Sequence, residues 1–186
     1  MTPVTALWLP ILVSLVVVFI LSSAIHMASP WHKSDFPRLA NEDAVMDALR
    51  PLALPPGDYM FPRPSSMAEM KSPEFVARVN RGPRAIMTVL PNGYAGMTGS
   101  LVGWAIFIFV VTFIAAAQAS VLLHVGAHGH AVFHTVGLFA LAAYCFALWP
   151  LSIWYGRSWG ISAKSTVDGL IYAAATGLIF MWLWPR

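Results

Sequence analysis

Four of the six histidines fall close together, with a spacing that could bind a metal ion or a haem. They are His124, His128, His130 and His134. The four-residue spacings place His124 and His128 on one face of a helix and His130 and His134 on another. Neutral imidazole is a ligand for zinc, copper, nickel and haem iron. One hypothesis is therefore a metal or haem site, in which the two sides of a turn bring His124 and His134 together.

A polar turn at a membrane surface is the other interpretation of these histidines, and we favour it. No Cys, Asp or Glu stands near them to complete a set of ligands. Their spacing also matches no defined zinc motif. The sequence thus assigns no cofactor, and a metal ion or a haem stays the competing hypothesis.

A second polar group lies at the ends of two apolar segments and consists of His26, His32, Lys164 and Asp168. A carboxylate just inside a membrane span costs about 1–3 kcal/mol unless it is paired. We therefore expect Asp168 to pair with His26, Lys164 or Arg157. The group could relay protons or bind a lipid headgroup. We favour a simpler role, in which Asp168 stabilises a helix N-terminus through the helix dipole and a salt bridge.

The elements that must position these residues are apolar helices. Only 10% of the residues are charged, and the 72 residues between Arg84 and Arg157 contain no charge. Because a soluble domain has about 25% charged residues, the composition excludes a soluble globular protein, a disordered chain and a nucleic-acid-binding protein. Four apolar runs are long enough to cross a bilayer, namely 6–27, 100–123, 131–155 and 167–184. The sequence predicts an all-α integral membrane protein with four transmembrane helices.

The expected organisation has three parts. Residues 1–27 form the first transmembrane helix, residues 28–99 a Pro-rich cytoplasmic surface segment, and residues 100–186 the other three transmembrane helices. Ten of the eleven Lys and Arg residues lie in the surface segment or between the last two spans. The positive-inside rule then places both of these loops in the cytoplasm and both termini outside. The predicted location is the bacterial inner membrane.

The surface segment shows local signals for a small mixed structure. Asn41 and Ser72 are suitable N-caps for two short helices, and Pro73 follows at the first position of the second helix. Residues 58–61 and 85–90 are strand candidates next to Pro-Gly and Asn-Gly turn signals. The segment has few large apolar residues, so we expect it to lie against the membrane or a partner.

The last span has a face of small residues, Ser165, Gly169, Ala173 and Gly177, which recur every four positions. Such faces allow helix backbones to approach closely. The sequence leaves open whether this face packs within the chain or against another protein.

The predicted function is a non-catalytic accessory or structural subunit of a larger bacterial inner-membrane assembly. Its expected partners are the lipid bilayer and other membrane subunits or a second copy, and not nucleic acid. One alternative is a metal- or haem-binding redox or transport protein that uses the cluster from His124 to His134. A weaker alternative is a membrane enzyme that acts on a lipid or quinone at the inner face through His26, His32 and Asp168.

Overall fold

The computed structural model describes all 186 residues and separates into two compact units. The helical unit consists of residues 1–37 and 96–186, and the small unit consists of residues 38–95. The boundary differs from the expected division at residues 28 and 99. Residues 29–37 belong with the helices because their side chains bond to the last helix, as described below.

The helical unit contains four helical segments that are long and apolar enough to cross a membrane. The first is α1 (Trp8–Ser23), which a 3₁₀ turn (Val4–Leu7) precedes and a π-helical turn (Ala24–Ala28) follows. The second is α5 (Thr98–Leu122). The third runs from α6 (Gly129–Cys145) through a 3₁₀ turn (Phe146–Leu148) into α7 (Trp149–Tyr155), and the fourth is α8 (Trp159–Leu183). The predicted number of long apolar helices is confirmed.

The third segment changes its helical geometry just before Pro150. Proline has no backbone N–H and its ring clashes with the carbonyl of the residue four positions earlier. That residue is Phe146, where α6 has ended and the single 3₁₀ turn begins. The 3₁₀ turn thus lies where the proline ring disfavours a continuous α-helix, and α7 starts with Pro150 in its first turn.

The fourth segment begins eight residues earlier than the sequence predicts, at Trp159 and not at Val167. The polar residues Ser162 and Lys164 lower the hydropathy of its first turns but do not stop the helix. Asp168 is therefore well inside α8, beyond the first turn to which the favourable dipole effect is confined. The interpretation of Asp168 as a residue of a helix N-terminus is wrong.

The small-residue face of α8 packs against α6. A Cβ atom at Gly177 would lie 2.9 Å from Cδ2 and 3.0 Å from the carbonyl oxygen of Phe133. At Gly169 a Cβ would overlap with Cys145 Sγ and lie 3.1 Å from Tyr144 Cβ. The two helices approach this closely because glycine leaves room for the facing side chains.

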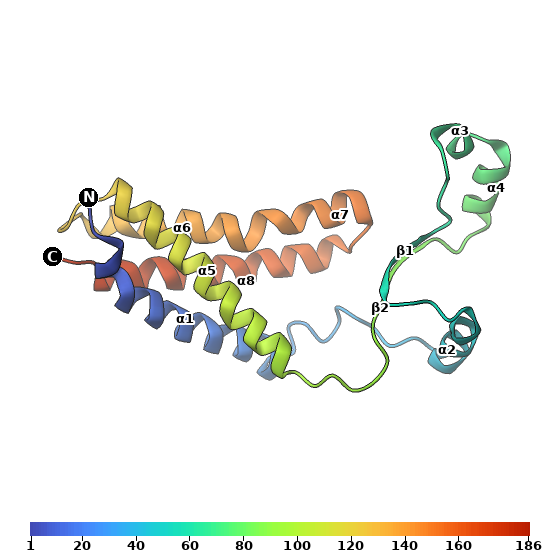
Figure 1. Ribbon diagram of the computed structural model, residues 1–186, viewed down its shortest axis with the longest axis horizontal. Helices are drawn as coiled ribbons and strands as arrows, with labels where there is room; N and C mark the ends of the chain where they lie inside the picture. Colours follow the sequence, from blue (N-terminus) through green and yellow to red (C-terminus); the bar gives the residue numbers. More distant parts are fainter. The chain divides into compact units, whose positions relative to one another are not determined.

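Both chain termini lie at the same end of the helical unit, next to the turn between α5 and α6 (Figure 1). The Thr2 N–H donates to the Ser120 carbonyl at 3.0 Å, and the Gly126 N–H donates to the Pro185 carbonyl at 2.8 Å. The Trp184 indole donates to the carbonyl of His124 at 3.1 Å. These bonds hold the first and last residues against the α5–α6 turn.

The small unit contains short elements with little burial. Its helices are α2 (Glu42–Leu49), α3 (Met67–Met70) and α4 (Pro73–Arg81), and a 3₁₀ turn (Arg50–Leu52) follows α2. Strands β1 (Gly57–Phe61) and β2 (Ala85–Val89) pair antiparallel, with Gly57 opposite Val89. The predicted caps are confirmed, since Asn41 accepts from the Ala44 N–H and Ser72 from the Phe75 N–H. Phe75 is the one buried residue in this unit.

The α6–α8 contact generates a stability prediction. Gly177→Ala should lower the free energy of unfolding by about 1–3 kcal/mol, because the added methyl group displaces Phe133 from a close-packed interface. Thermal unfolding of the purified protein in detergent measures the effect. The matched control is Gly103→Ala on α5, where a Cβ meets no atom within 4 Å. Equal midpoints for the two variants would contradict the close approach of α6 and α8.

Candidate metal centre

The polar residues at the end of α1 are positioned by the π-helical turn and the segment that follows it. The turn carries His26, whose Nδ1 lies 3.0 Å from the Ser22 carbonyl oxygen. Because a carbonyl only accepts hydrogen bonds, Nδ1 donates this bond, and in the neutral ring Nε2 then has a free lone pair. Such π-helical turns are frequent at functional sites. Here the turn presents a histidine whose unprotonated nitrogen is free to bind a metal ion.

After this turn, the chain folds back toward α8 through two tight turns. The Lys33 N–H donates to the Pro30 carbonyl at 3.1 Å, and the Asp35 N–H donates to the His32 carbonyl at 3.0 Å. Trp31, His32 and Asp35 all bond to residues of α8 from this short stretch.

His32 lies between two carboxylates. Its Nε2 is 2.9 Å from Asp168 Oδ2, and its Nδ1 is 2.6 Å from Asp35 Oδ2. The other Asp168 oxygen, Oδ1, accepts from the Trp31 indole at 3.1 Å. Both oxygens of Asp168 are thus bonded, which a carboxylate with only 5% of its side chain exposed requires.

Lys164 lies one turn before Asp168 on α8 and forms an ion pair with Asp35. Its ammonium lies 2.7 Å from Asp35 Oδ1 and donates to the Trp31 carbonyl at 2.8 Å. It also donates to Ser34 Oγ at 3.0 Å. The bond from Lys164, followed by the bond from His32, holds the pKa of Asp35 below its ordinary value. Asp35 therefore keeps its charge at neutral pH, and this stabilising contribution is lost only as the pH falls through the lowered pKa.

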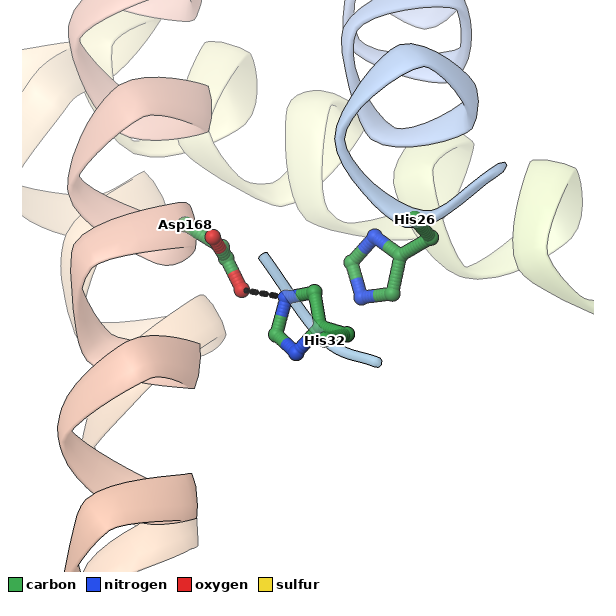
Figure 2. A group of neighbouring side chains, drawn as sticks. All are labelled: His26, His32 and Asp168. Carbon is green, nitrogen blue, oxygen red and sulfur yellow. Dashed lines mark hydrogen bonds and ion pairs between the residues drawn. The ribbon is translucent and has the colours of Figure 1, made fainter. Parts of the chain in front are cut away.

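Three of these side chains form a group that could hold a metal ion. Ligand atoms of His26, His32 and Asp168 all lie within 4.8 Å of one another. The two imidazole rings stack with their centroids 4.3 Å apart and their planes 11° from parallel. Figure 2 shows His32 between the other two, with Asp168 reaching in from α8 and His26 from the end of α1. We call these three residues the inner cluster.

The surroundings of the inner cluster resemble the outer shell of a metal site. Histidines that bind a metal almost always donate their second ring N–H to a carboxylate or a backbone carbonyl. His26 has such a bond to the Ser22 carbonyl, and His32 has one to Asp35. Two imidazoles and one carboxylate fit zinc or iron(II) and leave coordination positions open.

The expected partners of Asp168 were wrong. Neither His26, Lys164 nor Arg157 bonds to this carboxylate, whose donors are His32 and Trp31. Lys164 pairs with Asp35 and not with Asp168, although it lies four residues away on the same helix. Asp35 and Trp31 were not predicted to belong to this group. The spacing of His32 and Asp35 directly after an apolar span is the signal that could have found them.

The four histidines of the α5–α6 turn are arranged differently. All four side chains are exposed, and the inner cluster is the one group of three or more metal-ligating residues with its ligand atoms this close. His128 is the N-cap of α6, where its Nδ1 accepts from the His130 N–H at 3.3 Å. The rings of His130 and His134 are 6.4 Å apart. A metal or haem at this turn stays a prediction.

The chain matches no known protein family, no curated protein and no solved structure.

Proposed function

We propose that this chain is a multi-pass membrane protein that binds a divalent transition-metal ion through the inner cluster. The observation that carries the proposal is the path of bonds from Lys164 through Asp35 to His32 Nδ1. A carboxylate on the far nitrogen of a histidine orients the ring and raises its basicity toward a metal. The ammonium of Lys164 keeps that carboxylate charged and in position.

The donor atoms limit the kind of ion. Two imidazole nitrogens and one carboxylate oxygen suit zinc or iron(II), whereas calcium and magnesium prefer ligand sets made of oxygen. A bound ion would take the place of the proton between His32 Nε2 and Asp168 Oδ2, which would be released to solvent, and both atoms would become ligands. With three protein ligands the ion keeps at least one open position, where it acts as a Lewis acid on a bound molecule.

The competing interpretation of the inner cluster is a purely structural ion-pair network. In it, a doubly protonated His32 donates to both carboxylates and thereby fastens residues 29–37 to α8. This interpretation explains the bonds of His32 and gives His26 only the role of stacking on it. The ligand atom of His26, which lies within 4.8 Å of those of His32 and Asp168, favours the metal-binding interpretation. The two stacked rings would turn so that both lone pairs point at the ion.

The proposed location is the bacterial inner membrane, with the inner cluster on the cytoplasmic side and both termini outside. The distribution of basic residues supports this orientation, because ten of the eleven lie in the two loops on the side of the inner cluster. The short turn at the other end carries none. Positively charged loops are retained in the cytoplasm.

A second candidate function is that of a subunit in a larger membrane assembly, and the small unit favours it. Helix α2 has an apolar face formed by Val45, Met46 and Leu49, all of them exposed. With Phe75 as its one buried residue, the small unit has little hydrophobic core of its own. An unpacked amphipathic helix of this kind fits a partner protein or a second copy of the chain.

The metal site predicts one bound ion per chain. The full-length protein, purified with a histidine-free tag and stripped with a chelator, should take up one Zn²⁺ or Co²⁺ when it is reloaded. His26→Ala and Asp168→Asn should each weaken binding by more than about 100-fold, since a ligand lost costs more than the loss of an outer-shell partner. Elemental analysis and a metal titration measure the stoichiometry and the affinity.

The control variants for this experiment are His128→Ala and His130→Ala, which should leave the affinity unchanged. Asp35→Asn should weaken binding by about 10–100-fold without abolishing it, because Asp35 orients His32 and does not touch the ion. If the protein binds neither Zn²⁺ nor Co²⁺, the proposal is wrong. If only the control variants lose the ion, the site lies at the α5–α6 turn.

The orientation can be tested with trypsin and sealed membrane vesicles. Trypsin should cut rapidly after the exposed Arg and Lys side chains of the segment 38–95 in inside-out vesicles, because the proposed topology exposes this segment on the cytoplasmic side. They should be protected in right-side-out vesicles. Mass spectrometry of the released peptides identifies the sites, and permeabilised vesicles are the control. Cleavage only in the right-side-out preparation would reverse the topology.

The subunit hypothesis predicts a stoichiometric partner or a second copy after gentle solubilisation at native expression. Leu49→Glu should release it, because the charge lies on the apolar face of α2. Asp43→Ala, in the first turn of the same helix, is the matched control and should retain the partner. Native mass spectrometry reports the composition, and a lone monomer of the unmodified chain would count against this function.

A further inference from the structure

A groove of about 300 Å³ adjoins the inner cluster, between the end of α1 and the start of α5. His26 lies in its wall and also belongs to the inner cluster. The opposite wall comes from the first turns of α5, with Ser100, Leu101 and Trp104. His26 is therefore the side chain that the groove and the inner cluster share.

The walls of the groove suit an apolar chain. Met27, Met97 and Leu101 supply aliphatic surface, and methionine adapts its shape to flexible ligands. The Trp104 indole has already donated its N–H to Ser22 Oγ at 2.7 Å, which leaves the ring as its contribution to the groove. Most of the lining surface is thus available for van der Waals contact with methylene groups.

The charge beside the groove suits an anionic headgroup. A divalent ion on the inner cluster adds two positive charges next to two carboxylates and one ammonium. Since Lys164 offsets Asp35, the ion and Asp168 leave one positive charge without a partner. An anionic oxygen donor satisfies this charge and fills an open coordination position of the ion.

We infer that the groove beside His26 and Trp104 binds the apolar chain of a single-chain anionic amphiphile, whose headgroup oxygen completes the coordination of the metal ion. The inference rests on the proposed metal site and adds the class of molecule that the site takes. A location between two apolar helices gives such an amphiphile direct access from the bilayer. The volume is at the lower end of the range for small-molecule sites, which fits one chain better than two.

The experiment uses full-length protein loaded with Co²⁺ in phospholipid nanodiscs. The visible spectrum of the ion reports a change in its ligands. Decanoyl hydroxamate and acetohydroxamate are the probes, because they carry the same anionic metal-binding group with and without a long chain. Decanoyl hydroxamate should change the spectrum at a concentration roughly 10-fold or more below that of acetohydroxamate, since each buried methylene contributes to binding.

Two variants separate groove binding from simple partition of the probe into the bilayer. Ser100→Phe fills the groove and should raise the half-saturating concentration of decanoyl hydroxamate about 10-fold, while that of acetohydroxamate stays the same. Gly103→Phe adds the same ring to α5 at a position where a Cβ meets no atom within 4 Å, and it should change neither value.

The outcomes are distinct for the two proposals. If the chain-length effect is equal in the unmodified protein and in both variants, the probe only partitions into lipid and the groove inference is overturned, while the metal site stands. An ordinary bilayer lipid that occupies the groove without binding the ion gives this same result. If Co²⁺ itself does not bind, both proposals fail together.

Discussion

Two carboxylates with little exposed side chain, Asp168 and Asp35, impose the constraint on which this polar end of the helical unit depends. Each has less than a tenth of its side chain exposed, and a charged group so placed is tolerated only when donors reach its oxygens. The donors to Asp168 come from Trp31 and His32, so the segment after α1 has to fold back onto α8. The same segment brings Asp35 next to α8, where the Lys164 ammonium donates to it. The position of His32 beside Asp168 is thus a consequence of satisfying these two charges.

Asp168 lies next to a close contact between α8 and α6. Gly169 follows it directly, and the absence of a side chain there allows α8 to approach Tyr144 and Cys145 on α6. Because this turn of α8 packs closely on α6, the backbone that carries the carboxylate is held against Tyr144 and Cys145. Close helix packing and the polar site are therefore two properties of the same turn. A preorganised position of this kind is what a metal ligand requires.

Local features of the fold could be predicted, because neighbouring residues determine them. The apolar runs, the caps at Asn41 and Ser72 and the break at Pro150 all depend on interactions within a few residues. The start of α8 could not be located in this way, since polar residues in its first turns mask the helix in a hydropathy pattern. The error moved Asp168 to a helix end and suggested the wrong partners for it. His32 and Asp168, which are 136 residues apart in the chain, carry no local signal of their contact.

The sequence by itself determined the apolar helical class, the four long helices and the two connecting segments that hold most basic residues, because composition and charge placement act along the chain. It also identified His26, His32, Lys164 and Asp168 as a polar group of interest. Only the tertiary structure decided that Asp35 belongs with them, that Lys164 pairs with Asp35, and that the small face of α8 packs against α6. These contacts join segments that lie far apart in the chain. Whether they form depends on distances in space, which the spacing of residues along the chain does not determine.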